Sequence, residues 1–89
     1  MKKLVQVQEV QNEGFVSLLG ERVLVYGLSF FYAGTLEGDN DTCILLKDAS
    51  IVYETGPHGD KKFKDAQALP HPLYIQKSAI ESFCKTDKV

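Results

Sequence analysis

The run of residues that most directly suggests chemistry surrounds one aromatic ring with three lysines. It consists of Lys61, Lys62, Phe63 and Lys64. Lysine ammonium groups attract phosphates and a phenylalanine ring can stack on a base, so this run is a candidate site for single-stranded RNA. A charge run on a loop is also commonly a solvated surface, and the sequence leaves that alternative open.

A second candidate is the aromatic run Phe30, Phe31 and Tyr32. Aromatic rings on a strand offer stacking platforms for single-stranded bases. Alternation along a strand sends Phe30 and Tyr32 to one side and Phe31 to the other, so at least one side is expected to be core. Phe30 and Tyr32 are therefore RNA-binding candidates, with packing in the core as the alternative.

Residues typical of catalysis or metal binding occur without informative spacing. Segment 56–72 holds two histidines and two aspartates, His58, Asp60, Asp65 and His71. Their irregular spacing carries no metal signature, and a solvated loop is expected. The glycines match no phosphate-binding spacing, and Cys43 lies in an apolar run typical of a buried thiol. We expect neither an enzyme nor a metal, cofactor or small-molecule substrate.

Length and composition narrow the possibilities further. With 89 residues, 44% hydrophobic and 25% charged, the chain is expected to be one globular domain with a modest core. A formal net charge of -2 excludes a broad basic field, so any RNA site must be local. Cys43 and Cys84 show no paired spacing, which suggests reduced thiols. Because no signal-peptide or membrane-spanning pattern is visible, we expect a cytoplasmic protein without membrane contact.

The elements that position the candidate residues follow from the hydrophobic pattern. Residues 1–11 form an N-terminal arm that alternates weakly, and Asn12 can cap a short helix over 12–19 that Gly20 ends. Residue types that favour β-structure then predict two strands from Arg22, with a bend at Gly34, and a third strand over 42–53.

The second half of the chain is predicted to be a loop and a strand pair. Residues 56–72 contain all three prolines and no clear period, which indicates a long loop. Short strands over 73–76 and 80–84 follow around a tight turn, and the tail 85–89 is polar enough to fray. The order of elements predicts a mostly β fold, a small five-stranded antiparallel barrel with a short N-terminal helix, in one domain over 1–89.

Segments 22–55 and 73–84 resemble the two motifs of the Sm and Sm-like family, and in particular its bacterial Hfq branch of RNA chaperones. Two runs resemble the first motif, Gly34-Thr35-Leu36-Glu37-Gly38 and Ile44-Leu45-Leu46-Lys47-Asp48-Ala49. One run resembles the second motif, Lys77-Ser78-Ala79-Ile80. The resemblance covers roughly residues 12–84, interrupted by the insertion 56–72. It implies a strongly bent five-stranded barrel whose copies assemble into a homo-oligomeric ring.

In such a ring the fourth strand of one subunit pairs with the fifth strand of the next. Pairing between copies also has a physical reason, because it removes the unpaired edges of an open barrel. The matching interface candidates are Tyr74, Ile75, Ile80 and Phe83. The alternative is that these four residues complete the core of the monomer.

The resemblance also implies two RNA-binding faces. The positions that match the uridine-binding face are Asp41, Thr42, Gln76, Lys77 and Ser78. Thr42 stands where the family has a stacking ring, and since stacking contributes about 1 to 3 kcal/mol per base, that site should be weak. Ser78 replaces a histidine. The adenine-binding face corresponds to the second strand, where the matching positions carry Phe30, Phe31 and Tyr32.

Two functions follow as hypotheses. The first is an Sm-like ring that binds single-stranded RNA through the aromatic strand or the lysine-rich loop. The second is an Sm-like ring or barrel that serves as a scaffold or protein-interaction module and has lost RNA binding. The replacements at Thr42 and Ser78 and the acidic balance favour the second hypothesis, whereas the aromatic and lysine-rich runs favour the first.

Overall fold

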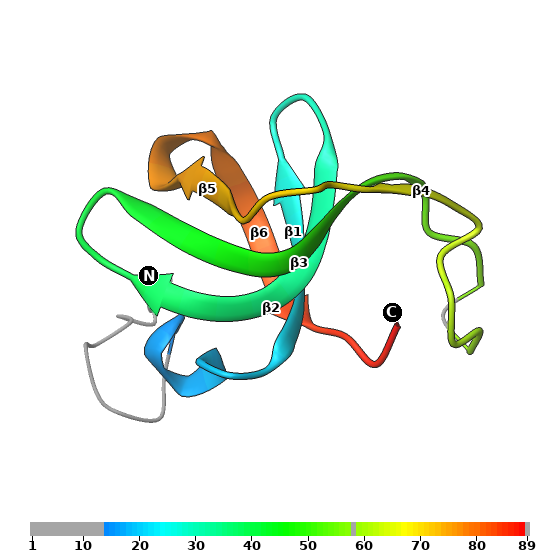
Figure 1. The fold of residues 1–89 in the computed structure, drawn as a ribbon, viewed down its shortest axis with the longest axis horizontal. Coiled ribbons are helices and arrows are strands. Elements are labelled where there is room, and N and C mark those ends of the chain that lie inside the picture. Colours follow the sequence, from blue (N-terminus) through cyan, green and yellow to red (C-terminus); the bar gives the residue numbers. More distant parts are fainter. Residues whose placement is uncertain (1–13, 58, 89) are drawn as a thin grey trace, which may run out of the picture.

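The computed structural model describes residues 14–57 and 59–88, which form one bent antiparallel sheet (Figure 1). Its elements in chain order are η1 (Val16–Leu18), β1 (Arg22–Gly27), β2 (Phe31–Asp39), β3 (Cys43–Glu54), β4 (Asp65–Ala68), β5 (Leu73–Gln76), η2 (Lys77–Ala79) and β6 (Ile80–Lys85), where η marks a 3-10 turn. The strand order is β4-β3-β2-β1-β6, and β5 also pairs with β3. The predicted mostly β fold class is confirmed.

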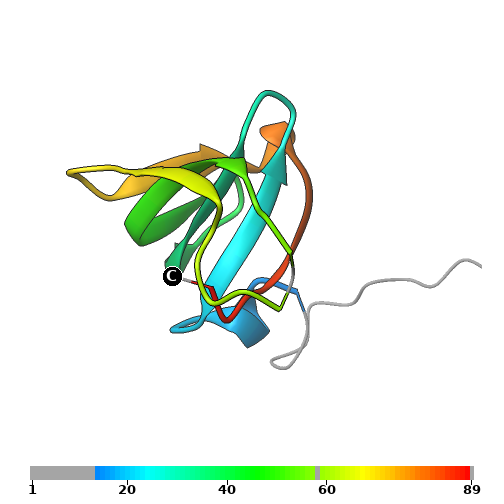
Figure 2. The same ribbon diagram turned by 90° about the vertical axis from the view of Figure 1, so that its right-hand side faces the viewer.

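The long strand β3 changes partners halfway along its length. Residues 43–46 pair with β5 and residues 50–54 pair with β4, while β2 runs along the other edge of β3. Between the two halves, Asp48 takes the left-handed conformation at φ 50°. Its carbonyl accepts a hydrogen bond from Nη1 of Arg22 at 3.0 Å. This kink lets the sheet curl, and Figure 2 shows the β1–β2 turn and η1 at opposite ends of the curled sheet.

Gly34 is where β2 accommodates the curl. The register between β2 and β3 shifts between Ala33 and Thr35, which marks an irregularity at the glycine. A Cβ at this position would lie 3.0 Å from Cβ of Leu46 and 3.0 Å from the carbonyl oxygen of Lys47. The close approach of β3 therefore requires glycine, and the bend predicted there is found.

The sheet buries side chains on both of its faces. The main cluster consists of Val23, Val25, Leu36, Ile44, Leu46, Ala49 and Ile75. A second cluster consists of Leu24, Ala33 and Val52, with Tyr26 and Phe63 packed against it. Because successive side chains of a strand point to opposite faces, β1 contributes Val23 and Val25 to one cluster and Leu24 to the other.

The predicted helix over 12–19 is wrong for the part that the structure describes. Only Val16–Leu18 is helical, as a single 3-10 turn. Gly14 has φ 65° and Leu19 has ψ 129°, and an α-helix cannot continue through either conformation. The proposed cap Asn12 and the arm over 1–11 lie outside the described residues.

The predicted uninterrupted loop over 56–72 is also wrong, because β4 lies inside it. All four residues of β4 are exposed, so the strand has no hydrophobic alternation that sequence reasoning could detect. It raises the number of strands from the predicted five to six. In the tail, Lys88 is buried at 4% exposure, although fraying was expected for 85–89.

The two strands around η2 lie at different ends of the sheet. β5 pairs with β3 and β6 pairs with β1, and among the described residues no pairing between β5 and β6 closes the sheet into a barrel. Each of these strands therefore has one edge without a partner strand in the described part of the chain. Unpaired edges of this kind are available for pairing with another chain.

We expect Gly34→Ala to lower the free energy of unfolding by about 1 to 3 kcal/mol, because the added methyl group overpacks the contact between β2 and β3. Gly38→Ala in the same strand is the matched control. Its Cβ would meet Leu45 at an ordinary 3.4 Å, so the expected change is within about 0.5 kcal/mol. Urea unfolding measures both variants, and equal effects would contradict the role of Gly34.

Candidate nucleic-acid interface

The residues that match the uridine-binding positions come together at one end of the sheet. Cys43 on β3 pairs with Gln76 on β5, and the backbone N–H of Lys77 donates to the carbonyl of Thr42 at 2.8 Å. Asn40 shapes the preceding turn, because its Oδ1 accepts the backbone N–H groups of Thr42 and Cys43 at 2.9 Å each. We call the group Asp41, Thr42, Gln76, Lys77 and Ser78 the turn site.

Within the turn site, Lys77 already has two partners from the protein itself. Its ammonium lies 2.6 Å from Oδ1 of Asp39 and 5.4 Å from the centroid of the Phe15 ring. Phe15 in turn stacks on Phe83 with ring centroids 3.8 Å apart. The other four residues of the turn site are exposed. The cation that was expected to contact phosphate is therefore neutralised locally.

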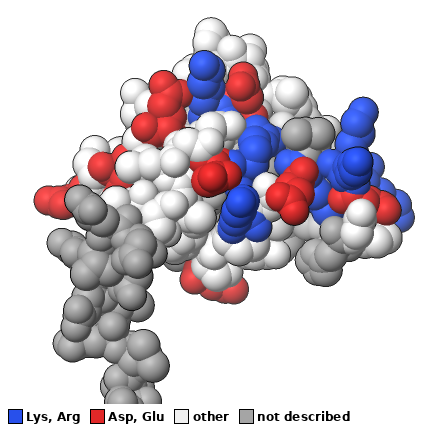
Figure 3. All heavy atoms as spheres, turned by 90° about the horizontal axis from the view of Figure 1, so that it is seen from below, with Lys and Arg blue, Asp and Glu red and all other residues white. Residues whose placement is uncertain are grey.

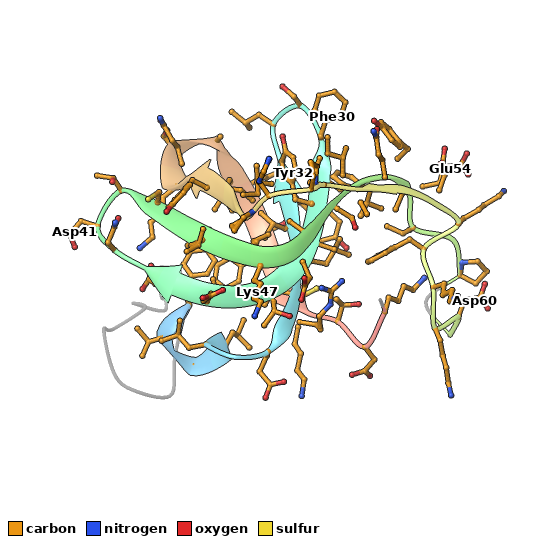
Figure 4. All side chains as sticks on the ribbon, in the orientation of Figure 1. Phe30, Tyr32, Asp41, Lys47, Glu54 and Asp60 are labelled. Carbon is orange, nitrogen blue, oxygen red and sulfur yellow. The ribbon has the colours of Figure 1, made fainter. Side chains whose placement is uncertain are left out.

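A cluster of exposed aromatic rings lies away from the turn site. Phe30 is 47% exposed, Phe31 38% and Tyr53 48%. Phe30 meets Tyr53 edge to face with centroids 6.3 Å apart, and the Tyr53 hydroxyl lies 3.2 Å from Oε1 of Gln67 on β4. We call Phe30 and Tyr53 the aromatic patch. Phe31 meets Tyr26 edge to face and pairs with Val52, so its side chain lies on the opposite face of the sheet from Tyr53. In Figure 4 Phe30 lies at the β1–β2 turn, whereas Asp41 lies at the β2–β3 turn.

The aromatic patch differs from the sequence prediction in one member, because Tyr53 and not Tyr32 lies beside Phe30. Tyr32 is partly buried against the main core cluster, so it does not share the exposure of Phe30. Phe30 precedes β2, which starts at Phe31, and strand alternation does not apply to it. Tyr53 was missed because it is distant in sequence, although its place at the end of a predicted strand was a usable signal.

The lysine-rich run 61–64 does not form one exposed surface, because its aromatic ring packs inward while its lysines are exposed. Phe63 packs against the second core cluster, and Nζ of Lys88 lies 5.5 Å from the centroid of its ring. Lys64 forms an exposed ion pair with Glu54 at 3.5 Å, and Lys61 and Lys62 are exposed. The ring proposed for base stacking thus serves the protein core. Figure 3 shows that lysines and arginines lie among aspartates and glutamates on the face seen there.

The buried Lys88 ties the C-terminal tail to the long loop. Its ammonium donates to the carbonyls of Thr55 and Pro57 at 2.6 Å each. Between the tail and the loop lies an open hollow of about 470 Å³, which Tyr26, Phe63 and Cys84 help to line. Sequence reasoning missed Lys88, since a lysine in a polar tail gives no signal of burial.

The four interface candidates occupy different environments. Tyr74 is 69% exposed, whereas Ile75 is 5% exposed and belongs to the main core cluster. Ile80 and Phe83 are partly buried and pack against that cluster. A second hollow of about 330 Å³ lies beside Tyr74, between β5 and the β1–β2 turn, and includes Leu28 and Tyr32 in its lining.

Two further features concern the described residues as a whole. No group of three or more histidine, cysteine, aspartate or glutamate side chains lies close enough within 14–57 and 59–88 to hold a metal ion. In the same part of the chain, no helix has the length and apolar character needed to cross a membrane.

No family model matches the chain, and no curated protein matches its sequence.

We expect Lys88→Ala to lower the free energy of unfolding by about 1 to 3 kcal/mol, because the partly buried carbonyls of Thr55 and Pro57 lose a charged donor. The loop around Lys61 and Lys62 should also be cleaved faster in limited proteolysis by trypsin. Lys85→Ala is the matched control, since the exposed pair of Lys85 with Glu21 at 3.6 Å should contribute less than about 1 kcal/mol. Equal unfolding curves for the two variants would contradict a stabilising role of the Lys88 hydrogen bonds.

Proposed function

We propose that this chain is the subunit of an Sm-like homo-oligomeric ring that binds single-stranded RNA through the aromatic patch. The observation that carries the ring is the position of β5 and β6. These strands are consecutive in sequence and separated only by η2. In the bent sheet, however, β5 pairs with β3 and β6 pairs with β1, so their free edges lie at different ends of the sheet. One subunit can then offer β5 to the β6 edge of the next without rearrangement.

The arrangement of the motifs supports the Sm-like part of the proposal. Gly34 sits at the irregularity of β2, and the apolar run 44–46 forms the first half of β3. Lys77–Ala79 is a 3-10 turn between two short strands. These are the places that the resemblance assigns to the residues.

Pairing between copies also satisfies the physical demands of an open sheet. Edge N–H and C=O groups without a partner strand favour association, and a closed ring would pair the free edges of β5 and β6 in every copy, leaving only the outer edge of β4 among the described strands. Tyr74 on β5 has a large apolar surface to bury on association, because it is 69% exposed and borders the hollow beside the β1–β2 turn. We propose that the β6 region of the neighbouring copy covers this surface and completes the barrel.

We expect the wild-type chain to have the mass of a ring in light scattering. Tyr74→Asp should shift that mass to the monomer, because a charge at the centre of the interface would be desolvated without a partner. Tyr53→Ser is the matched control, as it changes an exposed tyrosine outside the proposed interface and should keep the ring mass. A monomeric wild-type chain would overturn the ring.

RNA binding is carried by the exposure of the aromatic patch. Phe30, 47% exposed, and Tyr53, 48% exposed, present ring surface beside each other from the β1–β2 turn and the end of β3. Successive bases of a single strand can stack on such rings with little sequence preference. In a ring the patch is repeated once per subunit, so a single strand could contact several patches at once.

We expect Phe30→Ala to weaken binding of an adenine-rich oligonucleotide by about 1 to 3 kcal/mol for each base that loses its stacking partner. Val16→Ala is the control, because Val16 is an equally exposed apolar residue, at 46%, on η1. Fluorescence anisotropy of a labelled oligonucleotide measures both. If the wild-type ring does not bind adenine-rich RNA, the RNA-binding part of the proposal is wrong.

A second candidate function is a ring that serves as a protein-interaction module. The ion pair between Lys77 and Asp39 favours it, since the turn site then presents no free cation from Lys77 to a phosphate. Exposed apolar residues such as Leu28, at 72%, are also typical of protein-binding surfaces. A ring of stable mass that binds neither adenine-rich nor uridine-rich RNA would select this function.

A further inference from the structure

We infer that Asp39 acts as a specificity-determining residue that blocks the turn site against RNA phosphates by holding Lys77. This inference rests on the proposed function, because it explains which surface of the proposed RNA-binding ring is closed to RNA. The ligand class it concerns is a single-stranded, uridine-rich RNA, which would need Lys77 as its cation.

The geometry around Lys77 carries the inference. The side chain of Asp39 is only 15% exposed and that of Lys77 is 32% exposed, so their contact at 2.6 Å is partly shielded from water and salt. The Phe15 ring lies on the ammonium as well, 5.4 Å from centroid to Nζ. A carboxylate and an aromatic ring together take up the positive charge.

The backbone fixes both partners in place. Asp39 is the last residue of β2 and is paired with Ile44 of β3. Lys77 begins η2 and is anchored by its N–H to the carbonyl of Thr42. Because both ends of the ion pair are held by the sheet, Lys77 cannot turn to a phosphate by a backbone movement of the turn alone.

If Lys77 bound a phosphate instead, the carboxylate of Asp39 would lose its compensating cation. Its Oδ1 is buried, and among the described residues it accepts no well-directed hydrogen bond, so the ammonium of Lys77 is its compensating partner. A buried carboxylate oxygen without compensation is destabilising. The phosphate would in addition face the negative charges of Asp39 and the exposed Asp41.

The test is binding of a labelled oligouridine to Asp39→Asn, which removes the charge and keeps the shape of the side chain. We expect about tenfold tighter binding than for the wild-type chain, since one charge-assisted contact to phosphate becomes possible per site. The plot of log affinity against log salt should also become steeper by about 0.7 for each lysine that reaches a phosphate of the single strand.

Two further variants separate release of Lys77 from a general loss of negative charge. Asp41→Asn removes an exposed carboxylate from the same turn and should raise the affinity less than Asp39→Asn does, because it relieves only a screened repulsion and leaves Lys77 paired with Asp39. Adding Lys77→Met to Asp39→Asn should return the affinity to that of the wild-type chain. A gain that survives Lys77→Met, or an equal gain with Asp41→Asn, would overturn the inference.

An unchanged affinity of folded Asp39→Asn for oligouridine would also overturn it. Thermal melting checks the fold of each variant, and Asp39→Ser replaces Asp39→Asn if the latter does not fold. Ring mass and adenine-rich RNA binding are measured on the same samples. If the wild-type chain has no ring mass and does not bind adenine-rich RNA, the proposed function fails. The difference in oligouridine affinity between the variants tests only the role of Asp39.

Discussion

The close contact between β2 and β3 at Gly34 is the constraint on which the rest of this molecule depends. Because a side chain at residue 34 would lie 3.0 Å from the backbone of β3, only glycine lets the two long strands cross there without a shift. The left-handed Asp48 continues the bend within β3. The curl that results turns the two halves of β3 toward different partners, and so separates the β5 edge from the β6 edge.

The same curl distributes the candidate surfaces over the molecule. The turn site lies at the β2–β3 turn, the aromatic patch near the β1–β2 turn, and the lysine-rich run on the long loop, as the positions of Asp41, Phe30 and Asp60 in Figure 4 illustrate. Each surface has a different electrostatic character. The turn site is neutralised by its own ion pair, the aromatic patch is apolar, and the loop lysines stand beside acidic residues. An RNA strand would therefore meet stacking surface more readily than positive charge.

The sequence predicted the structure best where the hydrophobic pattern and the positions of glycines indicated the same element. The strands around Gly34, the run 44–46 and the pair of strands around Lys77–Ala79 follow from alternation and turn composition. It failed where structure depends on contacts between distant residues. β4 is held by its pairing with β3 and has no buried face, and the neighbour of Phe30 is Tyr53, more than twenty residues away. The pairing of Lys77 with Asp39 likewise arises only when η2 docks on the end of β2.

The hydrogen bonds of Lys88 have a consequence for the cooperativity of unfolding. They join positions 33 and 31 residues apart along the chain, so they close a large non-covalent loop that contains β4, β5 and β6. When this link opens, β4, β5 and β6 keep their pairing with β3 and β1, so only the tail and the unpaired part of the long loop are released. We therefore expect the tail and the unpaired part of the long loop to open together as one local unfolding unit, separate from the paired strands.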